Sequence, residues 1–276
     1  MARRLSQSGH EIVVWNRTAA TAEAVAADIG ARVAGTAAEA AAGVGVVIAS
    51  LADDTACLDV HTGPEGILEG VTSGTVVVDT STIAPETAKQ IAAEYERVGA
   101  HLLDGPVSGS VALVEQGTLT VMVGGDEEAL NVVRPVLDDL AKAVFHLGPN
   151  GAGATMKLAV NSLVHATNLA IAEALVLAEK AGVERQRVYE VFANSAGASP
   201  FLLYKRDAFE RPDETPVAFS LDLVEKDLDL ILGLASRVDA PMPQLEATAQ
   251  VTEEAVANGR GDQDMSALAV HLRSGS

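Results

Sequence analysis

The first 150 residues alternate short apolar runs with helical segments, and this alternation constrains the fold more than any other feature of the chain. The runs EIVVW, VGVVIASL and TVVVDTST are rich in β-branched residues, and helical segments such as PETAKQIAAEYERVG lie between them. Strands that are apolar along their whole length are typical of a parallel sheet covered by helices on both faces. We therefore predict a doubly wound α/β domain over residues 1–150.

The pattern changes after Gly153. The segment ATMKLAVNSLVHATNLAIAEALVLAEKAG keeps helical periodicity over roughly 29 residues without a proline, and three further helical segments follow it. No strand is evident there, so we predict an all-α domain over residues 151–276, built on one long helix. Polar residues such as Asn161, His165 and Asn168 interrupt the apolar run, which favours a buried helix of a soluble protein over a membrane span.

The chain opens with MARRLSQSGHEIVVWNRT, which resembles the second half of a βαβ unit. The first residues predict a short helix that ends at Gly9, and a strand follows directly. The strand and the tight turn of the first half are not in the sequence. We expect the reading frame upstream of Met1 to supply them, and we expect the 276-residue chain to be marginally stable and a weak dinucleotide binder without them.

Charge and cysteine content exclude several classes of protein. The net charge is −19 and no basic stripe is present, which argues against nucleic acid as a partner. Cys57 is the only cysteine, which fits a reducing, cytoplasmic compartment, and MARRL lacks the apolar run of a secretory signal. The six histidines are scattered without ligand spacing, so we predict no metal site, and His165 is interpreted as a core histidine with satisfied hydrogen bonds.

Polar residues follow four of the predicted strands, where a doubly wound sheet binds its ligands. Lys157 and Asn161 lie one turn apart on the long helix and therefore share a face. A snorkelling lysine beside a buried amide would give the same spacing, and an ordinary turn would explain a Ser-Gly-Ser sequence. The stretches after the strands are Asn16-Arg17-Thr18, Ala52-Asp53-Asp54, Ser81-Thr82 and the loop GPVSGS, which contains Ser108-Gly109-Ser110.

Five stretches carry a resemblance to a known family: DTSTIAPETA, DGPVSGS, GTLTVMVGGD, GPNGAGATMKLAVN and FSLDLVEKDLDL. In these stretches, which run in family order across nearly the whole chain, the sequence resembles the β-hydroxyacid dehydrogenases. That family includes 3-hydroxyisobutyrate dehydrogenase, tartronate semialdehyde reductase and the glyoxylate/succinic semialdehyde reductases. The resemblance implies a Rossmann domain followed by an all-α domain, and hydride transfer between a nicotinamide cofactor and a small β-hydroxy acid or its semialdehyde. It also implies that Met1 and Ala2 lie just after the family's glycine-rich loop.

The resemblance assigns roles to particular residues. It implies that Lys157 is the catalytic acid/base, which exchanges the hydroxyl proton as the hydride moves, and that Asn161 orients the substrate. Ser108 and Gly109 would bind the substrate carboxylate, and Ser110 stands where the family usually has glycine. The remaining residues would bind the cofactor: Leu51 and Ala52 beside the adenosine, Thr82 near the nicotinamide ribose, and Lys226 from the second domain, for which a surface ion pair with Asp229 is the alternative.

The turn after the first strand predicts which nicotinamide cofactor is bound. An NAD enzyme places an acidic residue here to bind the ribose 2′-hydroxyl, and Asn16 takes that place. Arg17 can contact a 2′-phosphate through two donors, and Thr18 can donate to it as well. We therefore predict NADP rather than NAD as the cofactor, against the alternative that this turn is simply solvated.

Two other functions are open at the level of sequence. A descendant without the glycine loop could keep the fold and lose catalysis. An imine reductase would share the architecture, but those enzymes usually replace the family lysine, so Lys157 argues against that function. The resemblance further implies a homodimer or homotetramer formed through the helical domain, with which the apolar long helix is compatible.

Overall fold

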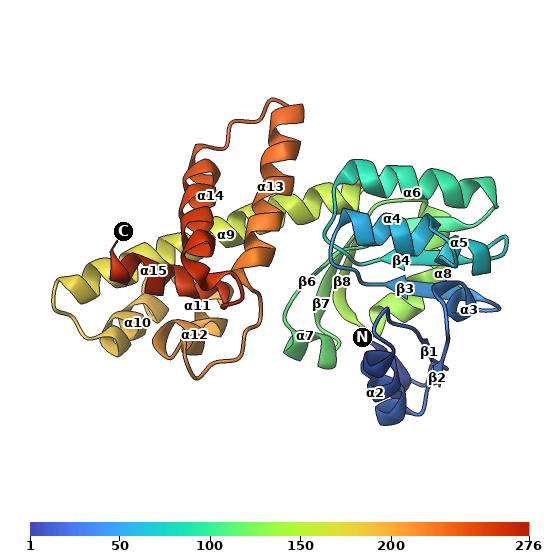
Figure 1. Ribbon diagram of the computed structural model, residues 1–276, viewed down its shortest axis with the longest axis horizontal. Helices are drawn as coiled ribbons and strands as arrows, with labels where there is room; N and C mark the ends of the chain where they lie inside the picture. The colour runs from blue at the N-terminus through green and yellow to red at the C-terminus, as the bar shows by residue number, and fades with distance from the viewer. Residues whose placement is uncertain (276) are drawn as a thin grey trace. The chain divides into compact units, whose positions relative to one another are not determined.

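The chain forms two compact units, Met1–Lys157 and Leu158–Ser276, in the computed structural model shown in Figure 1. The structure describes residues 1–275. All named strands of this described part lie in the first unit, and the second unit is helical. The long helix that joins the units begins in the first and continues through the second.

Short, mostly parallel strands build the first unit. They are β1 Val13–Val14, β2 Arg32–Val33, β3 Val46–Ala49, β4 Val76–Asp79, β5 His101–Asp104, β6 Val107–Ser108, β7 Leu119–Val123 and β8 Ala141–His146. They pair as β1-β2, β3-β4-β5 and β6-β7-β8, and only the β6–β7 pairing is antiparallel. Parallel pairing with intervening helices confirms the predicted doubly wound α/β class.

Helices connect these strands, and some of them begin at a side chain that caps the first turn. Asp53 and Asp126 each accept a hydrogen bond from a backbone N–H of the first turn, in α4 and α8 respectively. Asp126 directly precedes a helical segment in the sequence, which is a typical N-cap position. The helices are α1 Ala2–Gln7, α2 Ala19–Ile29, α3 Ala37–Ala41, α4 Asp54–Thr62, α5 Ile67–Gly70, α6 Pro85–Arg97, α7 Val111–Glu115 and α8 Glu127–Asp138.

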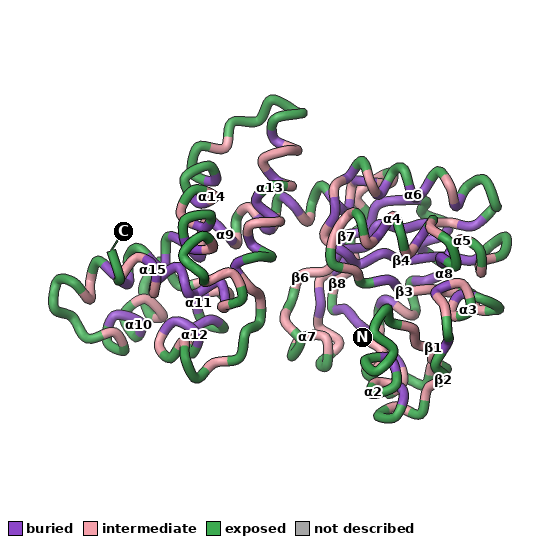
Figure 2. The backbone as a smooth tube through the Cα atoms, in the orientation of Figure 1, coloured by how far each residue is buried: buried purple, intermediate pink, exposed green. Residues whose placement is uncertain are grey.

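Strand β4 separates two apolar clusters, as its run of three valines predicts. Val77 belongs to the cluster that contains Ile91 of α6, whereas Val76 and Val78 belong to the cluster that contains Val133 of α8. Successive side chains of a strand point to opposite faces, so both faces of β4 are covered. Figure 2 shows the strand as a continuous buried segment.

The second unit packs around the long helix α9, Ala152–Lys180. The other helices are α10 Arg185–Ala193, α11 Pro200–Tyr204, α12 Arg206–Glu210, α13 Leu221–Arg237, α14 Pro243–Ala255 and α15 Leu268–Ser274, with short helical turns at Val256–Arg260 and Met265–Ala267. The predicted all-α character is confirmed, but α11, α12 and α15 were not predicted. Each of the three is too short to show a helical period in the sequence.

Helix α9 is long and apolar enough to cross a membrane by length and composition alone. Half of its most apolar window is nevertheless buried inside the protein. Leu158, Ala172 and Leu175 belong to the core of the second unit, together with Leu228 of α13. The helix therefore has the packing of a core helix.

A buried ion pair fixes the loop before α13. Lys205 is only 2% exposed, and its Nζ donates to both carboxylate oxygens of Asp264 at 2.8 and 2.7 Å. The same carboxylate accepts from the backbone N–H groups of Ala218 and Ser266. Burial acts to raise the pKa of Asp264, but the lysine and these donors hold it below its usual range. The pair therefore remains charged in the interior.

Candidate active site

The loop that carries the Ser-Gly-Ser sequence begins at a buried carboxylate. Asp104, the last residue of β5, is 1% exposed. Its oxygens accept hydrogen bonds from the backbone N–H groups of Gly151 and Ala154, both at 2.9 Å, and from Asn150 Nδ2 at 3.2 Å. Burial raises the pKa of Asp104 above its usual value, although these donors act against the rise. The carboxylate thereby satisfies orphan donors in the first turn of α9.

At the start of α9 the backbone segments lie so close together that a side chain on Gly153 would not fit. A Cβ added to Gly153 would lie 2.3 Å from the carbonyl oxygen of Asp104 and 2.4 Å from that of Met122. The bridge between Asp104 and Gly124 links the end of β5 to the end of β7 at the same place. The stretch GPNGAGATMK is therefore the fixed start of α9, and Lys157 follows Ala154 by less than one turn.

The loop that contains Ser108–Ser110 turns sharply as soon as β6 ends. Ser108 pairs with Thr120 of β7, and Gly109 takes a φ of +144°, which favours glycine. A Cβ on Gly109 would also meet Leu119 Cδ2 at 2.7 Å. Ser110 precedes α7 without a hydrogen bond from its side chain to that helix. Ser108 and Ser110 are both partly exposed.

Lys157 and Asn161 occupy one face of α9, as predicted from their spacing. Lys157 is partly buried, whereas Asn161 is 6% exposed. Asn161 Nδ2 donates to Asp227 Oδ2 on α13 at 2.6 Å. Asp227 is a residue of this site that the sequence analysis missed. Its only sequence signal is its position directly after Lys226 in FSLDLVEKDLDL.

Two further residues surround Asp227. Lys226 Nζ lies 3.0 Å from Asp227 Oδ1, and His165 Nε2 lies 3.5 Å from Oδ2. His165 is buried as expected, but the prediction that its hydrogen bonds are satisfied is wrong. Neither ring nitrogen has a hydrogen-bond partner within residues 1–275. The Asp227 Oδ2 acceptor lies 3.5 Å from His165 Nε2, which is longer than a normal hydrogen bond.

Three of the residues predicted to bind the cofactor, Asn16, Arg17 and Thr18, follow β1. Asn16 Oδ1 accepts a hydrogen bond from the Thr18 N–H at 2.8 Å, and Thr18 is the N-cap residue of α2. The Asn16 side chain therefore shapes the turn, which leaves Arg17 exposed at its centre. An exposed guanidinium beside a helix start is a donor set that suits a phosphate group.

The ends of β3 and β4 are tied together where the other cofactor residues lie. Leu51 N–H donates to Ser81 Oγ at 2.8 Å, and Ser81 N–H donates to Asp79 Oδ1 at 2.8 Å. Ala52 is exposed and Thr82 is partly buried directly beyond these contacts. The structure thus brings Leu51, Ala52 and Thr82 to one edge of the sheet.

A buried network behind this edge was not predicted. His61 Nε2 lies 3.0 Å from Asp79 Oδ2, and its Nδ1 lies 2.9 Å from the Tyr95 hydroxyl. Burial acts to raise the pKa of Asp79, but the hydrogen bond from His61 holds it below its usual range. The three residues are far apart in the sequence and carry no shared motif, so no sequence signal could have identified the network.

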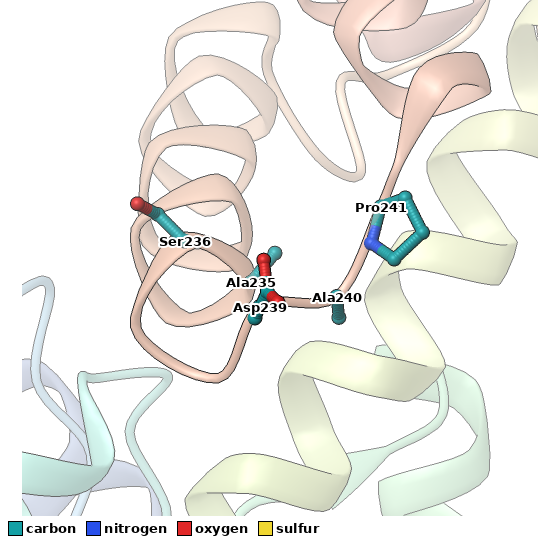
Figure 3. Close-up of a pocket in the computed structure, with 5 residues that line it drawn as sticks. All are labelled: Ala235, Ser236, Asp239, Ala240 and Pro241. Carbon is teal, nitrogen blue, oxygen red and sulfur yellow. The ribbon is translucent and has the colours of Figure 1, made fainter.

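No group of three or more His, Cys, Asp or Glu residues within residues 1–275 is arranged to hold a metal ion. The hollow drawn in Figure 3 lies where α13 ends, and its lining is Ala235, Ser236, Asp239, Ala240 and Pro241. A single carboxylate among small side chains does not provide the donors that an anionic cofactor or substrate needs.

The first unit has a parallel sheet with a polar turn after its first strand, and the helix that follows the sheet carries a lysine. This arrangement is typical of a nicotinamide-dependent dehydrogenase. Family models agree with this class. Residues 1–148 match the NAD binding domain of 6-phosphogluconate dehydrogenase, and residues 151–272 match the NAD-binding domain of NADP-dependent 3-hydroxyisobutyrate dehydrogenase.

Individual relatives cover almost the whole chain. The 2-(hydroxymethyl)glutarate dehydrogenase of Eubacterium barkeri is 32% identical, over 97% of this chain and 89% of that protein. Glyoxylate/succinic semialdehyde reductase 1 of Arabidopsis thaliana is 32% identical, over 97% of this chain and 92% of that protein. A solved structure of Mycobacterium tuberculosis 3-hydroxyisobutyrate dehydrogenase with L-serine has a TM-score of 0.85 at 32% identity, over 99% of this chain and 94% of that one. The chain therefore belongs to the β-hydroxyacid dehydrogenase family, which transfers a hydride between a nicotinamide cofactor and small hydroxy acids.

The close packing at the start of α9 predicts the effect of one methyl group. We expect Gly153→Ala to lower the free energy of unfolding by about 1–3 kcal/mol, because the new Cβ overlaps two carbonyl oxygens. Gly45→Ala is the matched control, since a Cβ there meets no atom within 4 Å. Urea unfolding of both variants measures the difference. Equal stability of the two variants would show that the approach at Gly153 does not constrain the helix.

Proposed function

We propose that this protein interconverts a small β-hydroxy acid and its semialdehyde, with Lys157 as the acid/base. The observation that carries the proposal is the position of Lys157 just beyond the turn of α9 that the Asp104 carboxylate caps. This fixed start gives the lysine a defined place on the helix. The names of the relatives, which act on glyoxylate, succinic semialdehyde and hydroxymethylglutarate, support a small carboxylate substrate.

Proton transfer is the part of the reaction that this chain's own residues perform. A nicotinamide cofactor, proposed to be held by residues such as Arg17, Thr82 and Lys226, would supply hydride transfer at the carbon that carries the substrate oxygen. During oxidation the hydroxyl proton passes to the neutral amine of Lys157, and during reduction the Lys157 ammonium gives a proton to the carbonyl oxygen.

The Ser108–Ser110 loop is the proposed carboxylate site. The Ser108 hydroxyl and the Gly109 N–H supply donors, and the φ of Gly109 allows its backbone to lie against a ligand. Ser110 adds a hydroxyl where the family usually has glycine. Because the chain carries a net charge of −19, such local donors have to overcome an unfavourable overall field for an anionic substrate.

NADP is the proposed cofactor. An exposed Arg17 in the turn after β1, with Asn16 in place of an acidic residue, supports a 2′-phosphate at this position. A carboxylate at the Asn16 position would instead repel that phosphate.

A homodimer or homotetramer is the proposed assembly. Met156, Leu163 and Leu177 are 40%, 70% and 73% exposed and follow one another at multiples of seven residues on α9. Ala170 is also exposed and completes the sevenfold spacing. Such spacing places side chains in one stripe along a helix, and an exposed apolar stripe is suited to the same stripe of a second copy.

The proposed acid/base predicts a loss of turnover. We expect Lys157→Ala to lower kcat by about 10²–10⁴-fold, the range of general acid/base catalysis, with little change in cofactor affinity. Steady-state rates with NADPH and succinic semialdehyde or glyoxylate, together with calorimetric cofactor binding, measure the two effects separately. Lys142→Ala, at an exposed position of β8, is the control. A Lys157→Ala variant with near-normal kcat would remove the lysine from the mechanism.

The proposed phosphate site predicts a change in cofactor preference. Arg17→Asp should weaken NADPH and improve NADH relative to it, because a carboxylate repels the 2′-phosphate and accepts from a 2′-hydroxyl. Calorimetric dissociation constants for both cofactors give the ratio. The same charge change at Arg187, an exposed residue of α10, should leave the ratio unchanged. If the unmodified protein already prefers NADH, the assignment of Arg17 is wrong.

The proposed assembly predicts the effect of charges on the stripe. A Leu163→Asp/Leu177→Asp variant should elute at a smaller mass than the parent protein, because each charge would be buried in the interface. Light scattering after size exclusion measures the mass. Leu203→Asp on α11, where the side chain is 53% exposed, is the control. A monomeric parent protein would contradict the proposed assembly.

A further inference from the structure

A buried carboxylate between α9 and α13 is not accounted for by the reaction as described so far. Asp227 is fully buried, and its two oxygens face different groups. Oδ1 lies 3.0 Å from Lys226 Nζ, whereas Oδ2 accepts from Asn161 Nδ2 at 2.6 Å and lies 3.5 Å from His165 Nε2. A negative charge is stable in a protein interior only where nearby hydrogen-bond donors or positive charges compensate it.

The surroundings of Asp227 keep it ionised. Burial acts to raise its pKa, but the nearby His165 and Lys226 hold the pKa below the usual range. Lys226, predicted from sequence as a cofactor residue, therefore also serves as a counter-ion on α13. An ionised carboxylate can only accept hydrogen bonds.

This charge determines which way the Asn161 amide faces. An asparagine side chain carries one group that donates and one that accepts, and the two look nearly alike in shape. Only the NH₂ group can lie 2.6 Å from a carboxylate oxygen, because the reversed amide would set its carbonyl oxygen against a negative charge. The carbonyl oxygen Oδ1 is therefore the Asn161 atom available to a donor.

A donor lies one turn earlier on the same helix. Lys157 and Asn161 are separated by four residues on α9, which places the lysine amine within reach of the Asn161 amide. A neutral lysine amine has two N–H bonds and one lone pair. If one N–H is directed to Asn161 Oδ1, the orientation of the lone pair is restricted.

We propose that Asp227 is a positioning residue that fixes the Asn161 amide with its oxygen toward the Lys157 amine, so that Asn161 orients the acid/base and does not bind the substrate carboxylate. The first half of this inference concerns Asp227 and Asn161 alone. The second half rests on the proposed function of Lys157.

The amide orientation can be observed without any reaction. In the full-length protein labelled with ¹⁵N, the Asn161 side-chain N–H that donates to Asp227 should give a strongly downfield proton resonance. Asp227→Asn should move that resonance upfield, and Asp229→Asn, at an exposed position of the same helix, should leave it in place. A resonance that Asp227→Asn does not move would overturn the inference, whatever the activity of the enzyme.

Kinetics then test what the fixed amide does. Asp227→Asn should lower kcat by about tenfold or more, up to the roughly 10²–10⁴-fold that the acid/base itself contributes, and should leave the KM for the carboxylate substrate unchanged. A variant in which KM rises instead, at unchanged kcat, would show that Asn161 holds the substrate carboxylate. Asp229→Asn should keep both constants.

An exchange of the two side chains separates position from stability. Asn161→Asp/Asp227→Asn preserves a hydrogen bond between the helices and still leaves an acceptor oxygen at position 161, so kcat should recover relative to Asp227→Asn alone. No recovery, at a melting temperature equal to that of the parent protein, would contradict the positioning role. If Lys157→Ala keeps its rate while the amide resonance is present, the proposed function fails and the Asp227–Asn161 assignment stands.

Discussion

The contact between the Asp104 carboxylate and the first turn of α9 is the constraint on which the site depends. Peptide N–H groups at a helix start need partners, and here a buried side chain from the end of a strand provides them. The same residue begins the Ser108–Ser110 loop. One side chain therefore sets the direction of the helix that carries Lys157 and the start of the loop proposed to hold the substrate, without any contribution from the second unit.

Much of this arrangement could be predicted from sequence, because it depends on patterns among residues that are close together in the chain. The apolar runs around Val77 could only be strands covered on both faces, and the long segment from Ala154 could only be a helix. The shared face of Lys157 and Asn161 follows from a spacing of four. The cap at Asp126 and the turn after Gly9 follow from the chemistry of single residues.

What could not be predicted depends on pairs that lie far apart in the chain. Asn161 and Asp227 are 66 positions apart, and His61 and Asp79 are 18 apart, so no period or motif links them. Whether a buried group has a partner depends on packing that a sequence does not show. The apolar pattern correctly predicted that His165 is buried. It did not show that the ring nitrogens of His165 lack hydrogen-bond partners.

The contacts that could not be predicted have a buried carboxylate in common. The chain is strongly acidic, yet Asp79, Asp104, Asp227 and Asp264 lie in its interior, each compensated differently. Asp264 faces a lysine, Asp104 faces peptide N–H groups, and Asp79 faces a histidine and a peptide N–H. A buried carboxylate orients the groups that donate to it. No donor can turn away without leaving a buried charge unpaired. The interior carboxylates thus define the orientation of the groups around them, and Asp227 does so for an amide one turn from the proposed acid/base.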